Sequence, residues 1–260
     1  FVISESVCVF CVPERPVKTD GSSTGIMDMF KALIHNDQAM TVVASIILVY
    51  TSINICGNLI LYFFKFDVGN EGAYSVFAAV VFAAQVLVMM IVPALRRKFT
   101  KFELFIFGFI IQIAGFAMML LLAVSGIYTS DNWYVFCLPG CMVYIGYGIL
   151  NVIMTIFLSD SVDYGEVKNK TREESVIFSM QTFTVKLASG LAIFLAGIIV
   201  DVIKLDKNAL VQSQSTLNGL RMWMTIPSVI LLIIGIIIFK KFYKLNEQKM
   251  NEIKAKLKLK

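Results

Sequence analysis

The sequence is poor in charged residues and in histidine. Charged residues make up 16% of its 260 residues, there is one histidine, and 58% of residues are hydrophobic. A soluble domain has about 25% charged residues, so the composition argues against that class. There is no phosphate-binding Walker loop, no H-E-x-x-H metal motif and no nucleophile with a histidine partner. We therefore expect neither an enzyme nor a resident cofactor or metal.

The apolar residues occur in runs long enough to cross about 30 Å of hydrocarbon. Runs of this length predict helices, because the backbone in lipid must satisfy its own hydrogen bonds. We therefore predict an all-α polytopic membrane protein. The net charge of +5 does not indicate nucleic-acid binding, since the basic residues flank these runs. The six predicted spans are residues 39–64, 73–95, 102–125, 133–158, 175–200 and 222–239.

The segments outside the spans predict four parts. We expect residues 1–12 to be the end of a truncated transmembrane helix. Residues 13–38 are rich in Pro, Gly and Ser, and we expect them to form a cytoplasmic linker. Residues 39–239 form the six-helix domain, and 240–260 a basic cytoplasmic tail. A cut helix, a long linker and six spans are expected of the second half of a two-half transporter of the major facilitator superfamily (MFS).

The distribution of lysine and arginine predicts the orientation of the chain. Basic residues crowd the connections that include residues 13–38 and 96–101 and the tail. The opposite connections hold few, and such a bias normally marks the cytoplasmic side. We therefore expect the linker and the C-terminus in the cytoplasm. The basic residues of the opposite side are Lys65, Lys204, Lys207 and Arg221.

Lys186 is the most informative single residue, because it lies within an otherwise uncharged span. At 1.5 Å per residue it is about 18 Å from Glu174 and about 22 Å from Asp201, too far for its stem to reach either surface. A charge at this depth costs about 2.5–3.5 kcal/mol on insertion scales. Such residues usually face a cavity, a partner or a substrate, although a passive buried lysine is the alternative.

Polar residues on three spans could share a substrate site with Lys186. Thr182 lies one turn before Lys186 on the same face, and Gln181 lies at the edge of that face. Tyr147 belongs to a polar stripe of its span and could stack on a sugar ring or simply pack against a helix. Asn58 could face a pore, although an interhelical hydrogen bond is an adequate alternative.

The densest polar cluster, residues 159–175, links two spans on the predicted cytoplasmic side. Asp160 and Asp163 can share a helix face, and Arg172 follows before the next span. These charges could form ion pairs that close the inner side. The alternative is an ordinary solvated loop, in which each exposed pair contributes under about 1 kcal/mol.

The residues from Ser159 to Gly190 resemble a signature of the glycoside–pentoside–hexuronide:cation symporters, the family of the melibiose permease. The shared pattern is an Asp, the run Asp-Tyr-Gly-Glu, a basic stretch, an Arg and Ser-x-Gln-Thr-x-x-x-Lys. Here these residues are Asp160, 163–166, Lys168, Lys170 and Arg172, then Ser179, Gln181, Thr182 and Lys186. The basic tail is also similar to the ending of that family.

The resemblance implies the C-terminal six-helix half of an MFS-type transporter. It implies that Lys186 and Thr182 face the sugar, with Gln181 close by, and that Asp160, Asp163 and Arg172, with Tyr164 of the same motif, belong to a cytoplasmic gate. It implies symport of a sugar, glycoside or hexuronide with Na⁺ or H⁺ across a bacterial plasma membrane.

The resemblance also places the cation site outside this chain, because the cation-binding acidic residues belong to the N-terminal half. No span interior here holds Asp or Glu. The expected partners are the sugar, membrane lipid and that N-terminal six-helix half. The alternatives are an MFS-type carrier of a non-sugar solute and a non-transporting membrane sensor.

Overall fold

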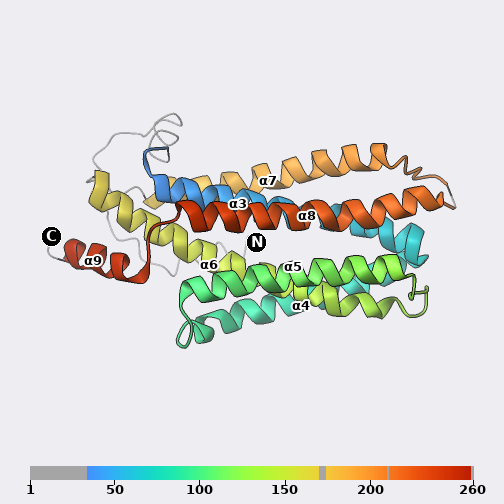
Figure 1. Cartoon of the computed structure of the whole chain (residues 1–260), viewed down its shortest axis with the longest axis horizontal. Coiled ribbons are helices and arrows are strands. Elements are labelled where there is room, and N and C mark those ends of the chain that lie inside the picture. Colours follow the sequence, from blue (N-terminus) through green and yellow to red (C-terminus); the bar gives the residue numbers. More distant parts are fainter. Residues whose placement is uncertain (1–33, 170–173, 210, 259–260) are drawn as a thin grey trace, which may run out of the picture.

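The computed structural model describes residues 34–169, 174–209 and 211–258, and these form a bundle of long helices (Figure 1). Six of the helices in these ranges are long and apolar enough to cross a membrane. The predicted cut helix 1–12, most of the linker 13–38, and Arg172 lie outside the described residues. The elements are α3 (Asp37–Tyr62), η1 (Phe63–Val68), α4 (Glu71–Leu95), α5 (Lys101–Ser125), η2 (Trp133–Phe136), α6 (Cys137–Asn169), α7 (Glu174–Val202), α8 (Gln214–Phe242) and α9 (Glu247–Lys258).

Four of the long helices begin at side-chain caps that the sequence encodes. The side chains of Asn36 and Asn70 accept backbone hydrogen bonds at the starts of α3 and α4. Thr100 forms a capping box with Glu103 at the start of α5, and Ser213 caps α8. These side chains satisfy N–H groups that have no partner within the helix, which fixes where each helix begins.

Helix α3 is central, because it contacts α6, α7 and α8. Helix α5 packs along α6 and α8, and α4 packs on α6. Glycines let α5 and α6 approach closely: a Cβ added at Gly146 would lie 2.6 Å from the carbonyl oxygen of Gly108. Helix α7 packs mainly on α3 and contacts α6 less, so much of its surface has no partner within the described chain.

The six predicted spans are confirmed, but two boundaries and one element differ from expectation. Helix α6 continues to Asn169, well past the predicted end at residue 158, so most of the predicted connecting cluster 159–175 is helical. Helix α8 begins at Gln214 rather than 222. The tail contains α9, which we did not predict and which buries Met250 and Ile253 although its sequence is largely charged.

Candidate substrate site and gate

Lys186 and Thr182 lie on an exposed face of α7. The side of α7 that packs in the bundle carries a stripe of buried residues, among them Thr184, Ala188 and Ala192. At 100° per residue, Lys186 lies roughly opposite this stripe, and both Lys186 and Thr182 are exposed. The structure therefore places the two predicted substrate residues on one face that points away from α3.

Gln181 lies at the edge of that face and belongs to a hydrogen-bond network that joins α7, α6 and α3. Its amide Nε2 donates to Thr155 Oγ1 at 3.2 Å, and Thr155 Oγ1 donates to the carbonyl oxygen of Asn151 at 3.0 Å. The amide of Asn151 donates to the Tyr50 hydroxyl at 2.6 Å. The ring of Tyr50 makes an edge contact with Tyr147, with centroids 5.4 Å apart. We call these five residues the inner polar network.

The network and Lys186 lie at the same depth in the bundle. Helices α3 and α7 run in the same direction from the end of the bundle that holds the tail (Figure 1). Tyr50 is about 20 Å along the axis from Asp37, and Lys186 is about 18 Å along the axis from Glu174. Both positions are therefore near mid-membrane, where transporter substrate sites commonly occur.

The structure does not bring Asn58 into this network. Its amide donates to the carbonyl oxygen of Asn54, one turn earlier in the same helix, at 2.7 Å. Asn54 in turn donates to the carbonyl oxygen of Tyr50 at 2.7 Å. These bonds stay within α3, so the interhelical bond that we considered as the alternative is not the one formed here. Asn58 instead lines a separate cavity of about 530 Å³ between α3 and α7.

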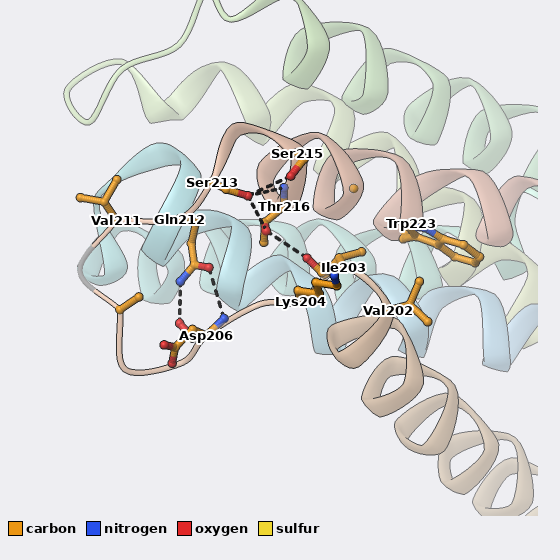
Figure 2. A pocket seen from close by; sticks show the side chains of 12 residues that line it. Val202, Ile203, Lys204, Asp206, Val211, Gln212, Ser213, Ser215, Thr216 and Trp223 are labelled. Carbon is orange, nitrogen blue, oxygen red and sulfur yellow. Dashed lines mark hydrogen bonds between the residues drawn. The ribbon is translucent and has the colours of Figure 1, made fainter.

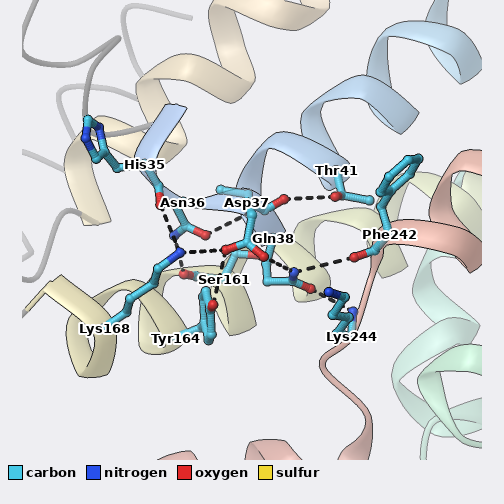
Figure 3. Close-up of polar contacts among 11 residues, drawn as sticks. His35, Asn36, Asp37, Gln38, Thr41, Ser161, Tyr164, Lys168, Phe242 and Lys244 are labelled. Carbon is cyan, nitrogen blue, oxygen red and sulfur yellow. Dashed lines mark hydrogen bonds and ion pairs between the residues drawn. The ribbon is translucent and has the colours of Figure 1, made fainter.

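The end of the bundle that holds the tail, here called the tail end, carries a polar cluster around the start of α3 (Figure 3). Lys168 donates to Asp37 at 2.8 Å, and the Tyr164 hydroxyl donates to the same carboxylate oxygen at 3.1 Å. Asn36, which caps α3, donates to the carbonyl oxygen of Ser161 at 2.8 Å. The cluster therefore fixes the start of α3 against the polar end of α6.

Gly165 has a steric reason to be glycine in this cluster. A Cβ at this position would lie 2.8 Å from Nδ2 of Asn36, closer than real Cβ contacts. The Asp-Tyr-Gly-Glu run therefore supplies two local functions at once. Tyr164 binds Asp37, and Gly165 leaves room for the residue that caps α3.

Asp160 is buried at the tail end and forms an ion pair with Lys101 of α5. The side chains of Lys101 and Asp160 are 4% and 9% exposed, respectively. Burial raises the pKa of the nearby Tyr243 hydroxyl above its ordinary value, and the charge of Asp160 adds to the rise. Asp163 lies almost one turn further along α6 and is half-buried. The four predicted gate residues thus divide into a buried Asp160, the half-buried Asp163 and Tyr164, and Arg172, which lies outside the described residues.

Sequence reasoning missed several residues of the tail-end cluster. Asn36, Asp37 and Gln38 fell within the predicted flexible linker, although Asn followed by Asp before an apolar run is a helix-start signal. Gln38 accepts from the backbone N–H of Lys244 at 2.7 Å, which ties α3 to the segment after α8. Lys101 gave no signal of its own, because it resembled an ordinary basic residue beside a span.

The other end of the bundle, here called the far end, is fixed by a second ion pair, whose side chains are largely shielded from water. Arg221 of α8 forms two hydrogen bonds of 2.7 Å with Asp67 of η1. Burial and the charge of Asp67 raise the pKa of Tyr128 above its ordinary value, so its hydroxyl stays protonated beside the pair. This bidentate arrangement is the geometry in which arginine binds a carboxylate most strongly. It ties α8 to the end of α3.

A cleft of about 570 Å³ also lies at the far end, where the chain turns from α7 into α8 (Figure 2). Several of its polar groups bind within the turn. Gln212 accepts from the backbone N–H of Asp206 at 3.2 Å, and Thr216 donates to the carbonyl oxygen of Ile203 at 2.9 Å. The cleft is therefore a structural corner, remote from Lys186. Within residues 34–169, 174–209 and 211–258, no three His, Cys, Asp or Glu residues are grouped to hold a metal ion.

Comparison with known proteins gives the family. Residues 6–247 match the family described as MFS/sugar transport protein. The chain is 28% identical to an uncharacterized symporter of Bacillus subtilis over 228 residues. These residues are 88% of the chain and 48% of the relative. It is 26% identical to the raffinose carrier protein of Pediococcus pentosaceus, over 92% of the chain and 37% of the relative. A putative sulfoquinovose importer of Salmonella typhimurium is also 26% identical, over 93% of the chain and 50% of the relative.

The chain thus spans about half the length, or less, of these relatives. The match to the family covers most of its residues, and the six long apolar helices are the architecture expected of such a half. The family is one of transporters and not of enzymes. The chain is an all-helical integral membrane protein that belongs to the MFS/sugar transport protein family.

Proposed function

We propose that this chain forms the C-terminal six-helix half of a cation-coupled symporter for a sugar, glycoside or hexuronide in a bacterial plasma membrane. The observation that carries the proposal is the exposed pair Lys186 and Thr182 on α7, at the same depth as the inner polar network. A lysine at this depth is costly in lipid. Its exposed face therefore belongs against the N-terminal half, with the substrate between the two halves.

The residues of this face have distinct roles in the proposed site. The ammonium of Lys186 donates hydrogen bonds to substrate oxygens, or neutralises a carboxylate of the substrate or of the N-terminal half. The Thr182 hydroxyl, one turn away, binds a neighbouring substrate hydroxyl. Gln181 is held by Thr155 and supports the edge of the site. Tyr147 offers an aromatic ring on the network side.

The tail end serves as the cytoplasmic gate in this proposal. The charge bias of the loops supports a cytoplasmic location for this end. The buried pair of Lys101 and Asp160 is a fixed part that holds α5 and α6 together. Asp163, Tyr164 and Arg172 lie further toward the end of α6 and in the following connection. There they can exchange partners with the N-terminal half as the two halves rock between inward-open and outward-open states.

The nature of the substrate divides two versions of the proposal. The raffinose carrier of Pediococcus pentosaceus and the lactose permease of Leuconostoc lactis are named for neutral sugars. Other relatives are named as a putative sulfoquinovose importer and a putative 2,3-dihydroxypropane-1-sulfonate exporter. An anionic non-sugar solute is the second candidate, because an exposed mid-membrane ammonium suits a negative charge.

Equilibrium binding by the purified full-length transporter tests the proposal. Labelled neutral glycosides, pentoses, hexuronates and short sulfonates are compared at several Na⁺ concentrations and pH values. We expect one sugar class to bind and Lys186→Ala to weaken that binding at least about tenfold, as the loss of a charged hydrogen bond implies. Lys204→Ala, at the exposed far-end loop, is the matched control and should bind normally. Normal binding by Lys186→Ala would remove this residue from the site.

A further inference from the structure

The cavity that Asn58 lines has the groups of a carbohydrate site, yet it lies away from Lys186. It is about 530 Å³ in volume, which is within the range that holds small ligands. One wall comes from α3 with Asn58 and Tyr62, and the other from α7 with Gly197 and Asp201. The loop after α7 borders it with Asp206 and Lys207. An aromatic ring, an amide, two carboxylates and an ammonium thus surround one space.

Contacts within the structure hold the groups of this cavity in place. The Asn58 amide donates one N–H to the Asn54 carbonyl, so its orientation is fixed and its other groups can bind a ligand. The ring of Tyr62 lies parallel to that of Phe66, with centroids 6.4 Å apart. The Lys207 ammonium lies 5.7 Å from the centroid of the Tyr62 ring. A ring flanked by polar groups is suited to a ligand with an apolar face and hydroxyl edges.

The cavity is connected to the mid-membrane site along one stripe of α3. Tyr50, Asn54 and Asn58 are each four residues apart, so they lie on the same side of the helix. Each is only partly buried, whereas the neighbouring positions Val49, Ile53 and Leu59 are buried. At 1.5 Å per residue, Asn58 is about 12 Å further along the helix axis than Tyr50. The stripe leads from the inner polar network to the cavity at the far end.

We propose that this cavity is a second, weaker saccharide-binding subsite, through which substrate passes between the outer face and the site at Lys186. This inference rests on the proposed function, which places the far end on the outside. The Lys207 ammonium lies over the Tyr62 ring in the unliganded cavity. On binding, the sugar ring takes its place against Tyr62, and Asn58 and Asp201 bind the sugar hydroxyls. A cation site is less suited to this space, because the ammonium of Lys207 lines the same cavity.

Tyr62→Ala distinguishes a binding subsite from a simple passage, and a variant that fills the cavity tests whether substrate uses this space at all. Tyr62→Ala removes the ring and widens the cavity, so a mere passage would conduct as well as before. A binding subsite would instead lose affinity, and the sugar concentration for half-maximal uptake from the outside should rise about three- to tenfold. Tyr62→Phe keeps the ring and should change the half-maximal sugar concentration less than about twofold. Gly197→Trp fills the cavity, since a Cβ there meets no atom within 4 Å, and should impair outside uptake as well.

The test uses the full-length transporter in right-side-out and inside-out vesicles, together with binding in detergent. We expect Tyr62→Ala to alter half-saturation from the outer face only and to leave equilibrium binding at the Lys186 site within about twofold. Unchanged half-saturation, or equal changes from both faces, would overturn the subsite.

A second measurement separates failure of the subsite from failure of the proposed function. In Lys186→Ala, ligand-observed NMR should still detect weak sugar binding, and adding Tyr62→Ala should weaken that binding at least about threefold further. Lys204→Ala, in the loop after α7, is the control: added to Lys186→Ala, it should leave the NMR signal unchanged. Complete loss of binding in Lys186→Ala alone would overturn the subsite but support the main site. Full-strength binding in Lys186→Ala would overturn the role of Lys186.

Discussion

Removing one partner of the buried pair between Lys101 and Asp160 should strongly destabilise the protein. Both side chains are almost fully shielded from water, at 4% and 9% exposure. Asp160→Asn would leave the Lys101 ammonium buried without a countercharge. Such a change costs about 3–5 kcal/mol, because a buried charge loses its compensation while remaining desolvated. By contrast, the pair of Lys168 and Asp37 is 43% and 50% exposed, and its loss should cost under about 1 kcal/mol.

A double-mutant cycle in the full-length transporter measures this difference. The free energy of unfolding is determined by detergent or denaturant titration for Asp160→Leu, Lys101→Met and the double variant. Each single change should be strongly destabilising. The double should return to within about 1 kcal/mol of the parent, since an apolar pair of similar size has no uncompensated charge. Lys168→Met is the exposed control.

Two results would refute this reasoning. Additive losses in the double variant would show that the two residues do not depend on each other. A cost for Asp160→Leu as small as that of Lys168→Met would show that Asp160 is solvated, as in the loop alternative. If the double variant is stable but does not transport, Asp160 has a role in the gate beyond holding α5 to α6.

Three further predictions concern the ends of the bundle and the isolated chain. Gly165→Ala should lower the free energy of unfolding by about 1–2 kcal/mol, because its Cβ would displace the Asn36 cap of α3. Gly190→Ala is the control and should leave this free energy unchanged, because its Cβ meets open space. Asp67→Asn should destabilise by about 3 kcal/mol or more by leaving Arg221 unpaired, and wild-type stability in denaturant titration would show that the pair is solvated. Residues 1–260 expressed alone should give no sugar uptake, and saturable uptake would contradict the assignment of this chain as one half.

The spans were predictable because long apolar runs in lipid have few alternatives to helix. The polar end of α6 was not predictable, because the apolar run ends near residue 158 while the helix continues to Asn169. That extension is stabilised by tertiary contacts, such as those of Tyr164 and Lys168 with Asp37. Helix α9 was missed for a similar reason, since its apolar positions gain stability only by packing on α6.

The candidate site was predictable in part. The position of Lys186 in an uncharged span and the spacing to Thr182 sufficed to place both on one face. The inner polar network was harder to predict, because the bonds from Gln181 to Thr155 and from Asn151 to Tyr50 join different helices. Spacing within one helix does not show which helices are neighbours. For the same reason, the sequence left open whether Asn58 faces a pore, and in the structure Asn58 lines the far-end cavity.

Gradient-driven uptake is the most direct test of sugar symport through the site at Lys186. Vesicles containing the full-length transporter are given radiolabelled sugars with and without an imposed Na⁺ or proton gradient, and Lys186→Ala is measured beside the parent. We expect one sugar class to accumulate above its external concentration only when a gradient is present, and Lys186→Ala to abolish this accumulation. Absence of sugar accumulation by a correctly inserted protein, or normal accumulation by Lys186→Ala, would contradict this expectation.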